Sequence, residues 1–189
     1  SLEIRSLMEG ELQRAAEVDR ETDETDPVTG IKNRKAFLEA VGDHWQQAEN
    51  GFDPFSMVMV EIDQYEEIRE QHGAEVANEL LKQVAGLIDT GLRTDDVLAR
   101  MNSAQFAIVL KNALSDGAVI CLERIRRKVA TTPFDAGEPL VVTISAGIVT
   151  WEKGMGIRQL LSRSDMSLAR ARDNGGNQLS VWGDALRGV

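Results

Sequence analysis

Two apolar runs separated by a short polar stretch constrain the fold of this chain most strongly. The first run is Val97 to Ala99, and the second extends from Phe106 to Leu110. Such runs are typical of buried strands, and Asn102-Ser103 between them predicts a hairpin turn because Asn tolerates positive φ. An antiparallel pair of strands is therefore expected at this point of the chain.

Apolar spacing along the rest of the chain predicts further strands and helices. Strands are expected over residues 55–62 and 140–151. Apolar side chains that recur on one face predict helices over residues 35–47, 65–71, 75–92, 116–130 and 157–172. The order β-α-α-β-β-α-β followed by a helix predicts an α+β fold, with a central, mainly antiparallel sheet flanked by helices, of the ferredoxin-like or nucleotide-cyclase palm kind.

Length and charge limit the classes of function. The 189 residues suffice for one domain with a full core and a short appendage. The net charge of −10 argues against nucleic-acid binding or membrane contact by this fragment, because no basic tract offsets it. Cys121 is the only cysteine, which excludes an internal disulfide and fits a reducing compartment.

With no long apolar stretch or signal peptide, a cytoplasmic location is expected. Because the chain starts at Ser1 rather than Met, any membrane tether is expected outside it.

Several motifs in register resemble those of the GGDEF family of diguanylate cyclases. In chain order these motifs are Asp26 to Arg34 (D-x-L-T-G-L-x-N-R in the family), Glu61 to Tyr65 (D-x-D-x-F), Arg100 to Phe106 (the Gly-Gly-acid-acid-Phe hairpin), Thr143 to Gly147 (the late strand) and Asp165 to Asn177 (the last helix and its G-R-N exit). The resemblance identifies residues 26–181 as a degenerate GGDEF domain. Residues 1–25 are then a linker or signalling helix, and residues 182–189 a C-terminal tail or linker.

The N-terminal segment leaves two interpretations open. Its apolar residues recur at helical spacing, at Ile4, Leu7, Met8, Leu12, Ala15 and Ala16. In the family such a helix joins an upstream sensor to the domain and often pairs as a coiled coil. The heptad is brief here, so a frayed helix is the alternative.

The resemblance implies a vestigial active site. Diguanylate cyclases hold one GTP per domain and join two domains face to face, with divalent metal on the triphosphate. The metal-holding carboxylates of the family fall at Glu61, which keeps its charge, and at Ala104, which does not. The neighbouring acid falls at Gln105, and the hairpin glycines fall at Asn102 and Ser103, where any side chain obstructs the nucleotide.

The family's guanine and phosphate contacts are altered as well. The guanine-reading Asn and Asp fall at Arg69 and Asn78, and an Asn offers only one acceptor oxygen. A family Lys falls at Glu66, which puts negative charge where phosphate would lie. The last-helix Lys falls at Arg172, and the G-R-N arginine at Gly176. The chain is therefore expected to be catalytically inactive, with no cofactor except Mg²⁺ if GTP binding survives.

A second site of the family is retained in the sequence. Arg93 and Asp96 match the R-x-x-D motif that lies five residues upstream of the hairpin and forms the family's allosteric site for cyclic di-GMP. Arg124 falls where the family often adds another arginine. Arg93 can donate to phosphate or to guanine and can stack on the base, while Asp96 can accept from the guanine N1–H. Taken singly, Arg93 is also explained by the dipole of a helix end and Arg124 by a solvated helix face.

A lost active site beside a retained product site favours a regulatory role. The chain is expected to be a receptor for cyclic di-GMP in bacterial second-messenger signalling, and its protein partner a second copy or a neighbouring domain. A different class of function is a ligand-free dimerisation or interaction module within a larger protein of GGDEF-EAL type. Also open are a GTP-binding regulatory domain that uses Arg172 and Glu61, and a weak diguanylate cyclase.

Overall fold

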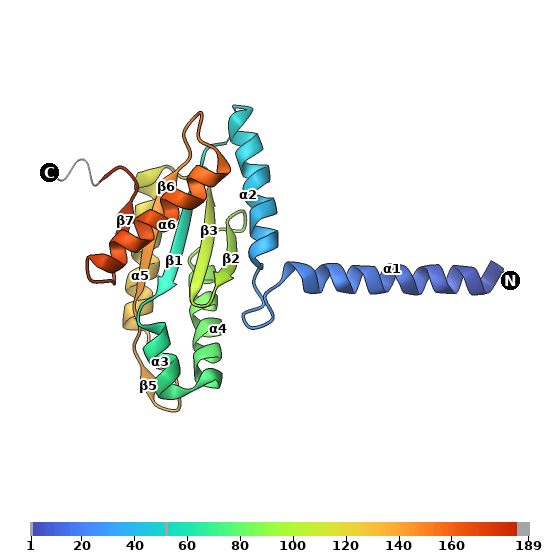
Figure 1. Cartoon of the computed structure of the whole chain (residues 1–189), viewed down its shortest axis with the longest axis horizontal. Coiled ribbons are helices and arrows are strands. Elements are labelled where there is room, and N and C mark those ends of the chain that lie inside the picture. The colour runs from blue at the N-terminus through green and yellow to red at the C-terminus, as the bar shows by residue number, and fades with distance from the viewer. Residues whose placement is uncertain (1, 52, 185–189) are drawn as a thin grey trace.

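Five strands form the central sheet, in the order β2-β3-β1-β6-β7 (Figure 1). The structure is a computed structural model that describes residues 2–51 and 53–184, and for residues 13–22 the backbone alone. β1 (Phe55–Ile62) is central and pairs antiparallel with β3 (Gln105–Lys111) and β6 (Ile144–Thr150). β2 (Val97–Asn102) pairs antiparallel with β3, whereas β7 (Leu179–Val181) runs parallel to β6. This mainly antiparallel sheet confirms the predicted α+β architecture.

Helices cover both faces of the sheet. α2 (Arg34–Glu49) and α6 (Ile157–Asp173) pack on one face, and α4 (Ala74–Thr90) and α5 (Ser115–Thr131) on the other (Figure 1). The short α3 (Tyr65–His72) lies beyond the end of β1. Each of these helices lies within two residues of its predicted bounds.

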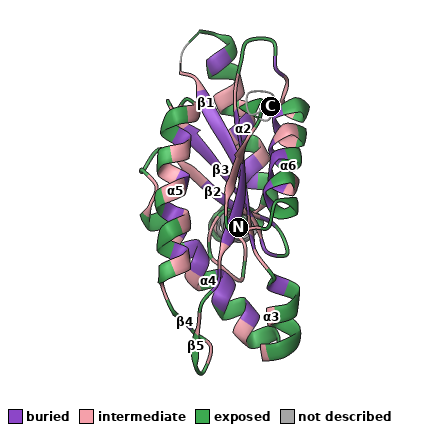
Figure 2. Ribbon diagram, turned by 90° about the vertical axis from the view of Figure 1, so that its left-hand side faces the viewer, coloured by how far each residue is buried: buried purple, intermediate pink, exposed green. Residues whose placement is uncertain are grey.

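The sequence of β1 explains its central place. Val58 and Val60 join the core beneath α4 and α5, while Met57 and Met59 join the core beneath α2 and α6. A strand buried on both faces is apolar at successive positions rather than at alternate ones. Figure 2 shows the buried strands between helices whose outer faces are exposed.

The N-terminal helix α1 (Leu2–Glu24) projects away from the domain (Figure 1). Its large apolar side chains are exposed, namely Leu2, Ile4, Leu7, Met8 and Leu12. The side chains of Ala15 and Ala16, which the sequence placed on the same face, lie outside the described residues, as does the end of the predicted tail, residues 185–189. Within the described part of the chain, no helix has the length and apolar character needed to span a membrane.

The hairpin turn lies one residue later than predicted. Asn102 pairs with Gln105, so the turn residues are Ser103 and Ala104, and the positive φ of 38° is at Ser103. The cause is an irregularity between Arg100 and Asn102, which shifts the register and draws Asn102 into the ladder.

The strand predicted over residues 140–151 is divided. Pro139–Leu140 forms a separate short strand, β5, which pairs with β4 (Phe134–Asp135), and β6 begins only at Ile144. The carbonyl of Thr143, just before β6, accepts a hydrogen bond from the backbone N–H of Asp63 instead of continuing a strand. The segment between β5 and β6 thus stabilises the turn that follows β1.

Candidate functional site

A cavity of about 530 Å³ lies where β1 ends and the β2–β3 hairpin turns. Its walls are the segment 61–67, the hairpin residues Ser103 and Ala104, Thr143, Arg172 and the two glycines Gly175 and Gly176. The structure therefore brings together four residues of the predicted vestigial active site, namely Glu61, Ser103, Ala104 and Arg172.

Glu61, on the wall of the first cavity, contacts two other polar side chains. Arg172 Nη1 lies 2.7 Å from Glu61 Oε2, and Gln105 Nε2 donates to Glu61 Oε1 at 3.4 Å. The side chains of Glu61 and Arg172 are 22% and 44% exposed, so the ion pair stands at the cavity wall, open to solvent. Ala104 is buried and its methyl group belongs to the core. Of the two predicted metal-holding positions, one is thus ion-paired and the other is apolar.

The hairpin turn is fixed by contacts to the start of the domain. Arg100 Nε donates to the carbonyl of Ser103 at 3.0 Å, and Arg100 Nη1 lies 3.3 Å from Asp26 Oδ1. Asp26 also accepts hydrogen bonds from the backbone and hydroxyl of Thr29. Ser103 Oγ in turn donates to Glu66 at 3.3 Å. The first motif of the sequence, Asp26 to Arg34, therefore has a structural role in holding the hairpin.

Asp63, at the rim of the first cavity, accepts three hydrogen bonds. The hydroxyl groups of Thr143 and Ser145 each donate at 2.7 Å, and the backbone N–H of Asn177 donates at 2.8 Å. A Cβ atom at Gly176 would lie 3.2 Å from this carboxyl group, and the φ of Gly176 is +73°. Glycine therefore suits this position, where the family has an arginine.

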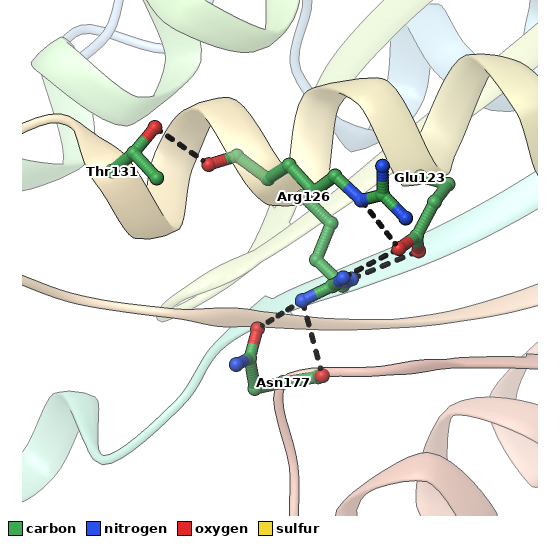
Figure 3. Close-up of polar contacts among 5 residues, drawn as sticks. Glu123, Arg126, Thr131 and Asn177 are labelled. Atoms are coloured by element: carbon green, nitrogen blue, oxygen red, sulfur yellow. Dashed lines mark hydrogen bonds and ion pairs between the residues drawn. The ribbon is translucent and has the colours of Figure 1, made fainter.

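A polar network connects the loop after α6 to α5 (Figure 3). Arg126 Nη1 donates to Asn177 Oδ1 at 2.7 Å, and Arg126 also binds Glu123 on its own helix. The hydrogen bond from Arg126 holds the pKa of the Glu123 carboxyl below its ordinary value, so Glu123 stays charged. Asn177 thus joins α5 to the carboxyl group of Asp63.

Three other residues of the predicted active site lie away from the first cavity. Arg69 and Asn78 are exposed on α3 and α4, and neither lines the cavity. Asn102 is exposed at the end of β2 and does not line it either. Among the described residues, no group of three or more His, Cys, Asp or Glu side chains is arranged to hold a metal ion.

A second cavity, of about 310 Å³, lies at the other end of the hairpin. Arg93, Asp96 and Arg124 all line it, together with Gly91, the segment 110–114 and the first turns of α5. The three residues of the R-x-x-D hypothesis are therefore neighbours in space, although Arg124 is on a different element. The length of β2 separates the two cavities by roughly 20 Å.

The polar groups of the second cavity differ in how far they are already engaged. The Asp96 carboxylate accepts from the backbone N–H groups of Arg93 at 2.8 Å and Lys111 at 3.1 Å. Arg124 Nη2 donates to the carbonyl of Gly91 at 3.1 Å, and a guanidinium group has further N–H donors. The Arg93 side chain is exposed and, within the described structure, has no hydrogen bond or ion pair.

Some residues of the second cavity were not predicted from the sequence. Leu114, Gly117 and Ile120 line it from α5, as does Cys121, whose thiol pKa is raised by burial and which therefore stays protonated. The available signal was their spacing, since residues three and four apart share one face of a helix.

Comparison with known proteins gives a consistent family. The family model described as "Diguanylate cyclase, GGDEF domain" matches residues 23–178. Diguanylate cyclase DgcP of Pseudomonas aeruginosa is 31% identical over 158 residues, which is 83% of this chain and 24% of that protein. Probable diguanylate cyclase DgcT of Escherichia coli K12 is 30% identical over 160 residues, 82% of this chain and 35% of that protein. The chain thus spans about a quarter to a third of the length of these relatives.

Solved structures share the fold. The coiled coil and GGDEF domain of DgcB from Caulobacter crescentus, in complex with c-di-GMP, matches 95% of this chain and 96% of its own with a TM-score of 0.89 at 22% identity. The GGDEF domain of FimX from Pseudomonas aeruginosa matches 84% of this chain and 98% of its own, with a TM-score of 0.79 and 27% identity. The family match, the relatives and the shared fold agree with the motifs and the hairpin described above, and this chain belongs to the GGDEF family.

Proposed function

We propose that this GGDEF domain is catalytically silent and is a receptor for cyclic di-GMP, bound at Arg93, Asp96 and Arg124. The observation that carries the proposal is that these three residues line one cavity. The cavity combines two guanidinium groups with a carboxylate fixed by two backbone N–H groups. Guanidinium groups suit phosphate, and a preorganised carboxylate suits the N1–H and amino group of guanine.

The chemistry of the first cavity supports the absence of catalysis. Mg²⁺ requires nearly ideal octahedral geometry from oxygen ligands. Glu61 is paired with Arg172, the Asp63 carboxyl accepts three hydrogen bonds, and Ala104 has no side-chain oxygen. The residues present do not fit the ion, and we assign no catalytic step to them.

Solved structures of other GGDEF domains contain the ligand that we propose. The GGDEF structures from DgcB are complexes with c-di-GMP, and so is another GGDEF domain that matches with a TM-score of 0.74. The curated relatives are named diguanylate cyclases, so binding and turnover must be measured separately.

Isothermal titration of cyclic di-GMP into the chain and its Arg93→Ala variant tests the receptor. The parent is expected to bind at micromolar concentration or tighter, about −8 kcal/mol. The variant is expected to lose binding without losing stability, because the Arg93 side chain makes no polar contact in the described structure. Arg158→Ala is the matched control, since Arg158 is an exposed arginine that does not line the second cavity. Equal affinity of Arg93→Ala and the parent would exclude this site.

Incubation of the chain with GTP and Mg²⁺ or Mn²⁺ tests catalytic silence. No cyclic di-GMP is expected, as followed by chromatography against a GGDEF cyclase of known activity. Product formed by the parent at a rate proportional to protein concentration would refute catalytic silence and restore the weak cyclase as the function.

A second candidate function rests on a different observation, the exposed apolar face of α1. The DgcB structure that matches 95% of this chain includes a coiled coil, so α1 is proposed to pair with α1 of a second copy. A chain that binds no guanine nucleotide and yet dimerises would be an interaction module rather than a receptor.

A further inference from the structure

The first turns of α5 depart from ordinary helix chemistry beside the second cavity. Leu114 is the N-cap residue, a position that favours Ser, Thr, Asp or Asn, and its side chain makes no capping hydrogen bond. Gly117 follows within the first turn, although glycine is unfavourable inside a helix and a Cβ there would meet nothing within 4 Å. Neither residue is explained by the stability of the helix.

The exposure of two apolar side chains is a third departure from ordinary helix chemistry. Ile120 is 68% exposed and Leu114 is 59% exposed. Outside α1, no other large apolar side chain in the described part of the chain is as exposed as Ile120. Both side chains line the second cavity. An unfavourable N-cap, a glycine within the helix and exposed apolar side chains at the same cavity together indicate a functional surface.

These residues share one face of α5 with the proposed phosphate-binding arginine. Leu114, Gly117 and Ile120 are spaced three apart, and Arg124 follows Ile120 by four, so all four lie along one side of the helix. The face thus presents an aliphatic side chain, bare backbone, a second aliphatic side chain and then a cation. A flat aromatic ring can lie against the bare backbone, while a phosphate attached to it reaches the arginine.

We propose that Leu114, Gly117 and Ile120 form the wall against which a purine base of the ligand lies, so that this face of α5 selects a guanine dinucleotide over a simple anion. The inference rests on the proposed function and extends it by naming the residues that contact the base. The cavity volume of about 310 Å³ is at the small end of ligand pockets, which fits one nucleotide of the ligand, with the remainder outside.

Two substitutions on α5 test this base wall, formed by Leu114, Gly117 and Ile120, by isothermal titration of cyclic di-GMP. Ile120→Ser removes an aliphatic surface, and the affinity is expected to fall about tenfold. Gly117→Leu fills the space for the base, and the affinity is expected to fall at least as far while the melting temperature stays the same or rises, because leucine is a better helix former. Val141→Ser is the matched control, since Val141 is 60% exposed and lies outside the cavity.

A direct readout accompanies the titrations. A nuclear Overhauser contact is expected between the guanine H8 proton and the δ1 methyl group of Ile120. Its absence, or unchanged affinity in either α5 variant while Arg93→Ala loses binding, overturns the base wall and leaves the receptor intact. If the parent itself binds no cyclic di-GMP, the receptor and the base wall both fail.

Discussion

At the scale of single residues, Asp63 shows how an acidic side chain at the rim of the first cavity can have a structural role. It fastens the end of β1 to β6 and to the loop after α6, through Thr143, Ser145 and Asn177. A carboxylate that satisfies three donors is costly to remove, because each donor then loses its partner in a partly buried place. Its retention therefore needs no catalytic explanation.

The Asp63→Ala variant is expected to lower the free energy of unfolding by about 3 kcal/mol. Urea denaturation followed by circular dichroism measures the loss. Glu67→Ala is the matched control, because Glu67 is an exposed acid on the same cavity and makes no hydrogen bond or ion pair in the described structure. Equal stability of the two variants would contradict the structural role of Asp63.

The resemblance to the GGDEF family predicted the grouping of residues in the second cavity better than the contacts made in the first. Arg93, Asp96 and Arg124 were expected to be neighbours because they match the R-x-x-D motif of the family and its additional arginine. The pairing of Glu61 with Arg172 was not, because the two residues are 111 positions apart and only the folded sheet brings α6 over the end of β1. The residues proposed to contact the base were not predicted, because the exposure of Leu114 and Ile120 is apparent only once the core is assigned.

At the scale of elements, α6 and β6 pack more closely than side chains normally allow. A Cβ atom at Gly147 would lie 2.3 Å from the backbone nitrogen of Leu168 and 2.4 Å from the carbonyl oxygen of Ser164. Both neighbours are backbone atoms of α6, so no rotamer change can relieve the contact. Glycine at this position sets the distance between helix and sheet.

Gly147→Ala is therefore expected to destabilise the domain by about 3 kcal/mol or more. Gly86→Ala is the contrasting control, because Gly86 is exposed within α4 and a Cβ there would meet nothing, so a gain of about 0.5–1 kcal/mol is expected. Thermal melts of the two variants give the comparison. A melting temperature of Gly147→Ala at or above that of the parent would show that α6 can move away from β6 without cost.

The elements were predicted well where the apolar period was long, as in α4, α5 and α6. Prediction was poorer for β6 and β7. The run over residues 140–151 is apolar almost throughout, and nothing in that pattern marks the break before β6, which depends on hydrogen bonds to Asp63. β7 has only three residues, and its pairing with β6 arises from the turn made by Gly175, Gly176 and Asn177, each at positive φ.

At the scale of the whole molecule, the two cavities occupy opposite ends of one hairpin. The first lies at the turn between Ser103 and Ala104, and the second where β2 begins and β3 ends. They share no lining residue. Substitution in the first cavity can therefore leave the lining of the second unchanged, which is what the proposed combination of catalytic silence and ligand binding requires.

The projecting helix α1 gives the last expectation. Most of the stability of a helix in a protein comes from packing of its apolar face. In α1, Leu7 and Leu12 are exposed and lie on a face with no partner in the described structure. Pairing with a second copy would bury that face.

In the absence of cyclic di-GMP, the parent is expected to sediment as a dimer, and the Leu7→Ser, Leu12→Ser double variant as a monomer with reduced helical content. The Glu3→Ser, Glu9→Ser variant changes two exposed residues of the same helix without removing apolar area, and it should remain dimeric. Equal sedimentation of both variants and the parent would mean that α1 does not hold two copies together. Because α1 lies apart from the second cavity, the monomeric variant should still bind cyclic di-GMP, so that assembly through α1 and ligand binding can be separated within one chain.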